Sequence, residues 1–166
     1  MTRIVVCDTG PLLHLSEAGA IHLLHNVGEI LIPPTVETEF KANAQGWLPP
    51  HWVKVTGLKE NVKQQAMDWV QEGHIDLGEA EAIGLALQMN ADWLLTDDAK
   101  ARQFSETFGL EVHGALGLLI WNVTAGYLDE RAQALTLLNH LAKSSLWVSE
   151  RVFHEAQKAI SILLPE

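Results

Sequence analysis

Short apolar runs recur along the chain and alternate with longer segments whose apolar residues recur every three or four positions. Runs of the first kind predict strands buried on both faces, as in parallel sheets. Strands are expected at residues 3–7, 29–32, 52–55, 92–96 and 111–113. Segments of the second kind predict amphipathic helices. These are expected near residues 8–15, 21–25, 35–42, 60–72, 79–89, 98–108, 115–124, 130–142 and 149–163.

Proline and glycine positions set several of the expected helix ends. Pro34 suits the first turn of the helix at 35–42. Gly73 is placed to cap the end of the helix at 60–72, and Gly78 is expected to precede the helix that starts at Glu79. Strands that alternate with helices in this way predict right-handed crossovers and a parallel sheet.

The expected fold is therefore an α/β fold: a three-layer α/β/α sandwich with a parallel sheet of four to five strands. The length of 166 residues fits a single domain. We expect its core at about 3–128, followed by C-terminal helices at about 130–164.

Acidic residues stand where separate segments should reach one edge of this sheet. Asp8 directly follows the first strand, and Asp97 and Asp98 follow the strand at 92–96. Glu39 lies about one turn into the helix after the second strand. Because the carboxyl ends of parallel strands share one edge, where ligands bind in such folds, these acids are expected to meet there.

Glu79 and Glu81 reach the same edge by a different route. A helix that leads back to a parallel strand runs antiparallel to the sheet, so the beginning of the helix at 79–89 lies at the carboxyl edge. Acidic residues are also favoured in first helical turns as caps, and Asp98 and Glu79 fit that structural role. Asp8 fits it less well, because a carboxylate directly after an apolar strand is costly to bury without a partner.

Carboxylates gathered within a few ångströms of one another repel strongly, so such a cluster must take up protons or cations. Oxygen ligands without histidine or thiolate favour Mg²⁺ or Mn²⁺. Such ions activate water and stabilise the leaving oxygen of a phosphodiester. The acid pattern therefore predicts a metal-dependent nuclease.

Composition changes this picture in two ways. The formal net charge of −10 opposes nucleic-acid binding through a basic surface, so cations in the site would have to neutralise the scissile phosphate. The single cysteine excludes an intramolecular disulfide and fits a reducing cytosol. No run of about 20 apolar residues predicts a membrane span. We therefore expect a cytoplasmic protein that does not bind membranes.

The segments V-V-C-D-T-G-P-L (5–12), I-P-P-T-V-E-T-E-F (32–40), L-G-E-A-E-A-I (77–83) and L-L-T-D-D-A-K-A-R (94–102) together resemble a PIN domain. With V-H-G-A-L-G-L-L (112–119), the chain resembles the prokaryotic branch related to toxin ribonucleases of the VapC type. The resemblance implies an Mg²⁺- or Mn²⁺-dependent ribonuclease, the toxin of a toxin–antitoxin pair. It also implies an RNA substrate, an antitoxin protein as partner and a homodimer.

Residue by residue, the resemblance implies a catalytic and metal-binding set of four acids: Asp8, Glu39, Glu79 and Asp98. Glu81 competes with Glu79 for one place, and Asp97 is an alternative or outer ligand. The hydroxyls of Thr9 and Thr96 would hydrogen-bond to ligands or to a metal-bound water.

Candidates for phosphate contact are few, and this departs from many PIN nucleases. Lys100 and Arg102 follow Asp98 closely in its helix, and Lys41 follows Glu39. Exposed helix charges explain each of them equally well. Trp47 and Trp52 flank a proline-containing loop; base stacking is one interpretation, and covering the core is the favoured one.

Two alternatives stay open at this point. The low basic content favours a non-catalytic PIN-like module that binds RNA or a protein. A phosphohydrolase or receiver domain on a similar sheet is the other. The first would have an acid where Gly10 stands, and the second would have a lysine where His113 and Gly114 stand.

Overall fold

Within residues 2–166, which the computed structural model describes, one sheet of five parallel strands organises the chain. The strands are β1 (Ile4–Cys7), β2 (Glu29–Ile32), β3 (Val53–Val55), β4 (Trp93–Leu95) and β5 (Val112–His113). They lie in the order β3-β2-β1-β4-β5, and each neighbouring pair is parallel. The α/β class and the parallel sheet expected from the sequence are confirmed.

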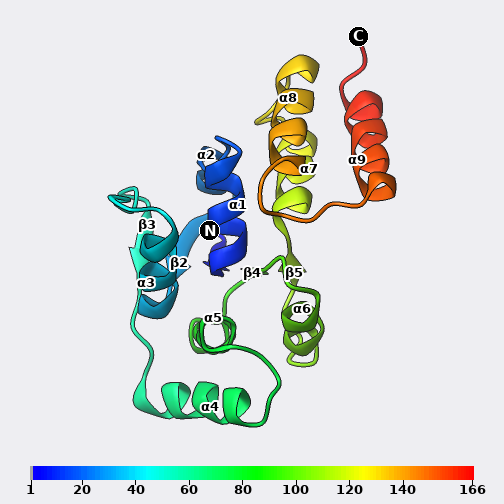
Figure 1. Cartoon of the computed structure of the whole chain (residues 1–166). Coiled ribbons are helices and arrows are strands. Elements are labelled where there is room, and N and C mark those ends of the chain that lie inside the picture. Colours follow the sequence, from blue (N-terminus) through cyan, green and yellow to red (C-terminus); the bar gives the residue numbers. More distant parts are fainter. Residues whose placement is uncertain (1) are drawn as a thin grey trace.

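Helices connect these strands and form layers on both faces of the sheet (Figure 1). They are α1 (Thr9–Glu17), α2 (His22–His25), α3 (Pro34–Asn43), α4 (Glu60–Gln71), α5 (Leu77–Gln88), α6 (Ala99–Glu106), α7 (Ala115–Thr124), α8 (Arg131–Ala142) and α9 (Glu150–Leu163). Within the described residues, none of them is both long and apolar enough to cross a membrane.

Side chains of the three inner strands, β2, β1 and β4, alternate between two cores, because successive residues of a strand point to opposite faces. In β1, Val5 and Cys7 pack in the core that includes residues of α1, α3 and α7. Val6 and Leu94 pack in the core with α4, α5 and α6. This alternation explains why the strands read as continuous apolar runs: both faces of the sheet are buried.

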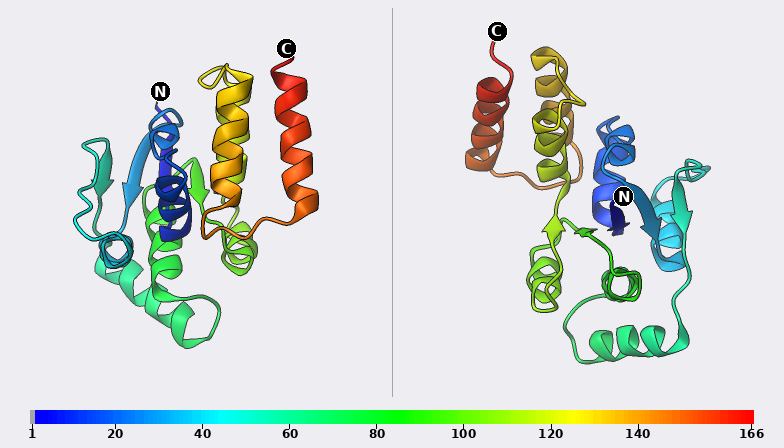
Figure 2. Two further views of the ribbon diagram at one scale, coloured as in Figure 1. Left: turned by 45° about the horizontal axis from the view of Figure 1, so that its top comes forward. Right: turned by 180° about the vertical axis from the view of Figure 1, so that it is seen from behind.

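The C-terminal helices extend the first of these layers. Leu138 of α8 and Ile160 of α9 are buried in the core that also holds the apolar face of α7. In Figure 2 the loop between α8 and α9 turns back toward the sheet. Ser145 in this loop donates a hydrogen bond of 2.5 Å to Oε1 of Glu17. This bond ties the loop to the end of α1, and the loop also borders a space with Asp8 and Asp98, the acids that follow β1 and β4.

One expected helix start is wrong in a way that affects the site. The expectation placed Gly78 before a helix opening at Glu79, whereas α5 begins at Leu77 and Asp76 is its N-cap. Glycine is disfavoured inside helices, which made Gly78 look like a boundary. Gly73, by contrast, follows α4 with φ 79°, the left-handed conformation expected after a helix end.

The two tryptophans near the proline-containing loop cover the core, as favoured from the sequence. The Trp47 ring centroid lies 4.2 Å from that of Phe40, and the Trp52 centroid lies 5.0 Å from that of His25. Both tryptophans pack against the core beneath α1 and α3. Their rings are therefore engaged within the protein.

Candidate active site

Asp8 occupies the end of β1 and caps the helix that follows. Its side chain is only 6% exposed. Oδ1 accepts a 2.8 Å hydrogen bond from the backbone N–H of Thr9, and Oδ2 accepts one of 3.1 Å from the hydroxyl of Thr96. Burial raises the pKa of Asp8 to about 7 from an ordinary value of 3.8, although these hydrogen bonds act against the increase. Asp8 thus carries a negative charge at a substantial energetic cost.

Asp98 and Asp97 follow β4 but point toward different partners. Asp98 is the N-cap of α6, and its Oδ1 accepts a 2.8 Å hydrogen bond from the N–H of Ala101. Oδ1 of Asp97 accepts a 2.7 Å hydrogen bond from the N–H of Ala115, and Oδ2 lies 2.7 Å from Nδ1 of His14. Asp97 therefore joins α1 and the start of α7 to the end of β4.

Glu39 extends from α3 toward the same edge of the sheet. Its Oε2 accepts a 2.6 Å hydrogen bond from the hydroxyl of Thr9. Gly78, near the start of α5, allows the carboxylate to come this close. A Cβ atom on Gly78 would lie 2.5 Å from both carboxylate oxygens of Glu39. The absence of a side chain at position 78 thus leaves the space in which the Glu39 carboxylate lies.

Glu79 reaches the edge from the first turn of α5 and forms a capping box with Asp76. The N–H of Glu79 donates 2.9 Å to Oδ1 of Asp76, and the N–H of Asp76 donates 3.0 Å to Oε1 of Glu79. Burial raises the pKa of Glu79 to about 8 from an ordinary 4.5. Repulsion from Asp76, Asp98 and Asp8 contributes to the same increase in the pKa of Glu79.

These side chains surround one cleft of about 380 Å³. Its lining comprises Asp8, Thr9, Gly10, His14, Glu39, Asp76, Glu79, Asp97, Asp98, Ser145, Leu146 and Trp147. Six carboxyl groups therefore face one space, and neither a lysine nor an arginine of the described residues lines it. The four acids assigned from the sequence, together with Asp97, lie in this cleft.

Other predicted residues lie outside the cleft. The Glu81 carboxylate accepts a hydrogen bond from the hydroxyl of Thr35 on α3. Lys41 forms an ion pair with Glu37, with 3.4 Å between Nζ and Oε2. Nζ of Lys100 donates 3.1 Å to the carbonyl of Gly73. Arg102 lines a separate hollow beside the cleft.

The sequence interpretation missed Asp76 and His14, the space that Gly78 leaves for Glu39, and the contribution of the α8–α9 loop to the cleft. Asp76 had a visible signal, because an N-cap acid followed three positions later by glutamate is the sequence pattern of a capping box. His14 had none: its partner Asp97 is 83 residues away in sequence.

The carboxylate oxygens of the cleft are suitable ligands for a hard divalent cation. In this structure, however, they accept hydrogen bonds from N–H and O–H groups of the protein. Carboxylates whose protonation is favoured by burial and mutual repulsion are stabilised by added positive charge. In residues 2–166, however, no group of three His, Cys, Asp or Glu side chains is placed ready to hold a metal ion. The caps of α1, α5 and α6 each engage one oxygen of Asp8, Glu79 and Asp98, and metal binding would require the carboxylates of the cleft to move closer together.

Comparison with known proteins places the whole fold in one family. A family model described as a PIN domain matches residues 4–161, which covers the sheet and the C-terminal helices. No curated protein matches the chain.

Proposed function

Because the chain belongs to the PIN domain family, whose fold is of a nuclease type, we propose that it hydrolyses RNA phosphodiesters with Mg²⁺ or Mn²⁺. The observation that supports this proposal most strongly is the cleft of six carboxyl groups without a lysine or arginine in its described lining. Burial raises the pKa values of Asp8 and Glu79 there to about 7 and about 8. A cation would offset both the burial of these charges and the smaller repulsion between them.

Asp8, Glu39, Glu79 and Asp98 are the proposed ligands, directly or through water. When bound, the divalent cation supplies the charge that neutralises the scissile phosphate and activates water for in-line attack. The protein orients the ligands. Hydroxyls of Thr9 and Thr96 donate to Glu39 and Asp8, respectively, and the N–H of Thr9 holds the second oxygen of Asp8. Asp97 holds His14 and the first turn of α7 at the rim.

Cleavage of mixed single-stranded RNAs tests the proposal. Wild-type protein should cleave RNA after Mn²⁺ is added and should stop when the ion is chelated. Asp98→Asn removes one proposed ligand while asparagine remains a good helix cap, so the fold should persist and cleavage should be lost. Cleavage that continues in chelator, or at the wild-type rate in Asp98→Asn, would show that another chemistry or a contaminant is responsible.

The role as a toxin, the antitoxin partner and the homodimer are finer proposals that rest on the resemblance of motifs. Expression of the chain in a bacterium should arrest growth, and Asp98→Asn should not. Co-expression of a neighbouring small gene with a DNA-binding pattern should restore growth. Sedimentation of the purified chain would give its oligomeric state. Normal growth with active, expressed protein would contradict the toxin role.

A non-catalytic RNA- or protein-binding module is the second candidate. The low content of basic residues favours its protein-binding form, and the engagement of cleft carboxylates in helix caps favours the absence of catalysis. Titration with Mn²⁺ separates the two functions. Binding that disappears in Asp98→Asn supports the nuclease, whereas no binding at millimolar Mn²⁺ supports the non-catalytic module.

Gly78→Ala is expected to reduce Mn²⁺-dependent cleavage without destabilising the protein. The new Cβ would displace the Glu39 carboxylate, from which it would lie only 2.5 Å. Because a glutamate side chain can rotate away, the strain should be small, and alanine gains up to about 1 kcal/mol over glycine in a helix. We expect an unchanged or higher melting temperature and a loss of activity of about ten-fold, comparable to the weaker effects of disturbing a metal site's surroundings.

Gly57→Ala is the matched control, because a Cβ there meets nothing within 4 Å and Gly57 does not line the cleft. It should leave cleavage unchanged. Full activity in Gly78→Ala would show that the position of Glu39 next to α5 is unimportant for the reaction.

A further inference from the structure

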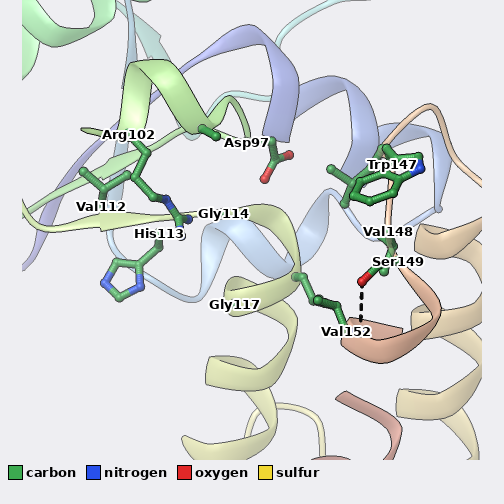
Figure 3. A pocket seen from close by; sticks show the side chains of 13 residues that line it. Asp97, Arg102, Val112, His113, Gly114, Gly117, Trp147, Val148, Ser149 and Val152 are labelled. Atoms are coloured by element: carbon green, nitrogen blue, oxygen red, sulfur yellow. Dashed lines mark hydrogen bonds between the residues drawn. The ribbon is translucent and has the colours of Figure 1, made fainter. Parts of the chain in front are cut away.

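A second hollow of about 420 Å³ adjoins the acid cleft and shares Asp97, Leu146 and Trp147 with it. Figure 3 shows Trp147 and its neighbours in the α8–α9 loop on one side, and Arg102 and His113 on the other. Gly117 of α7 lines the space between the two sides (Figure 3). A ligand bound at the acids could therefore extend directly into this hollow.

Trp147 differs from the other tryptophans of the chain in its surroundings. The five others each pack against at least one aromatic ring: Trp47, Trp52, Trp69, Trp93 and Trp121. Trp147 packs against no aromatic ring of residues 2–166 and is 84% exposed. Its indole faces are thus free for stacking at the boundary between the two spaces.

Arg102 gives the hollow a cation. Among the described residues, its guanidinium group donates no hydrogen bond and forms no ion pair. Gly114 lets the guanidinium and Asp97 approach the backbone together: a Cβ on Gly114 would lie 3.2 Å from Nη2 of Arg102 and 2.6 Å from Oδ1 of Asp97. In a chain with net charge −10, this arginine is an available phosphate contact beside the acids.

We propose that this hollow is a nucleotide subsite, in which a nucleobase next to the scissile phosphate stacks on Trp147 and its phosphate contacts Arg102. The inference rests on the proposed nuclease function, whose substrate it extends by one nucleotide. Leu116, Val148 and Val152 supply apolar side chains around the base. The volume lies within the range of about 300–1,000 Å³ for small-ligand pockets.

Continuity with the acid cleft favours RNA over a protein partner as the occupant. A stable protein interface needs roughly 800 Å² on each partner, whereas this hollow is a local concavity with one exposed aromatic ring and one arginine. Aromatic rings that stack on bases, with cations beside the backbone, are the usual elements of single-strand binding sites.

The test uses metal-free wild-type protein and mononucleotides, which contain no phosphodiester bond, so that binding is measured without cleavage. The indole N–H signals of the tryptophans are followed by NMR during titration with each of the four ribonucleoside 5′-monophosphates. Loss of one signal in Trp147→Phe assigns that residue. At least one nucleotide should shift the Trp147 signal, and ribose 5-phosphate, which lacks the base, should not. Trp147→Ala should weaken binding of that nucleotide by about five-fold to 150-fold.

Arg102→Ala should weaken binding of the nucleotide but leave binding of the corresponding nucleoside unchanged. Tyr127→Ala and Lys158→Ala are matched controls, an exposed aromatic residue and an exposed lysine that line neither space, and both should bind as the wild type does. Circular dichroism would establish that each variant is folded.

Failure of this inference can be told from failure of the proposed function. If Mn²⁺-dependent cleavage occurs but no nucleotide shifts the Trp147 signal at millimolar concentration, the subsite is wrong and the nuclease stands. Unchanged affinity in Trp147→Ala also overturns the subsite, and would leave this loop as a surface for a protein. If a nucleotide binds through Trp147 and Arg102 but RNA is not cleaved, the subsite stands and the nuclease is wrong.

Discussion

Asp8→Asn is expected to make the metal-free protein more stable at pH 8 and to abolish Mn²⁺-dependent cleavage. Burial raises the pKa of Asp8 to about 7, so the ionised side chain opposes folding at pH 8. Asparagine carries no charge and can keep both contacts. Its Oδ1 can accept from the N–H of Thr9, and its Nδ2 can donate to the hydroxyl of Thr96, because a hydroxyl both donates and accepts.

The rise in stability and the loss of cleavage should both be large enough to measure. A rise of about three pKa units limits the gain in unfolding free energy to about 4 kcal/mol, and about 1–3 kcal/mol is expected, since the asparagine contacts are weaker. For a chain of this size, that raises the melting temperature in chelator by roughly 3–10 °C. Cleavage should fall by at least about 100-fold, because even disturbing the partners of metal ligands costs about 10- to 100-fold.

Asp92→Asn is a suitable control for the stability measurement. Asp92 lies at the opposite edge of the sheet, where its Oδ2 accepts a 2.7 Å hydrogen bond from the N–H of Ile4. The same loss of charge should not stabilise the protein there. Should Asp8→Asn melt below the wild type at pH 8 and still bind Mn²⁺, the Asp8 charge is neither unfavourable nor part of a cation site.

The sequence pattern placed Asp8 and Asp98 at the carboxyl edge of the sheet because both follow predicted strands closely. A short apolar run followed by an acid places that acid at the carboxyl edge of a parallel sheet, whichever order the strands take. The strand order adds what the pattern could not give: β1 and β4 are neighbours at the centre of the sheet, so the two acids flank one crevice.

The choice between Glu79 and Glu81 depended on the helix start, which the pattern gave two residues late. With Asp76 as N-cap, Glu79 occupies the third helical position, where its side chain turns back toward the cap and the cleft. Glu81 then lies further round the helix and reaches Thr35 on α3 instead. Gly78 was treated as a boundary, although its role is to leave space for the Glu39 carboxylate.

The sequence pattern could not predict contacts between segments that lie far apart along the chain. His14 meets Asp97 across 83 residues, and Ser145 meets Glu17 across 128. The helical periodicity of residues 130–142 and 149–163 predicts an apolar face for each helix, yet it does not state where the connecting loop lies. That placement brings Trp147 to the rim of the cleft, and it depends on the packing of α8 and α9 on α7 and on the contact between Ser145 and Glu17.

Stability of the metal-free protein is expected to fall as the pH rises from about 5 to 9, and Mn²⁺ should oppose that fall. Asp8 and Glu79 both have raised pKa values, about 7 and about 8, in the folded protein. Each therefore binds a proton more readily in the folded than in the unfolded chain. The stability they contribute is complete below their ordinary pKa values near pH 4 and is lost as the pH passes through 7 and 8.

A double variant isolates this contribution from that of other titrating groups. The double variant Asp8→Asn/Glu79→Gln lacks both titrating carboxyl groups. The melting temperature of this variant in chelator should therefore change less between pH 5 and pH 9 than that of the wild type. For Asp8 alone, the linkage amounts to about 1.4 kcal/mol per pH unit while the folded form stays protonated and the unfolded form does not.

Mn²⁺ competes with protons for the same oxygens, because carboxylates bind metal in their ionised form. At a fixed millimolar concentration, the ion should therefore raise the wild-type melting temperature more at pH 8.5 than at pH 5.5. It should raise that of the double variant little at either pH. If the melting temperatures of wild type and double variant depend on pH in the same way in chelator, ionisation of Asp8 and Glu79 does not destabilise the folded protein. An equal rise with Mn²⁺ in both proteins would place the cation elsewhere on the molecule.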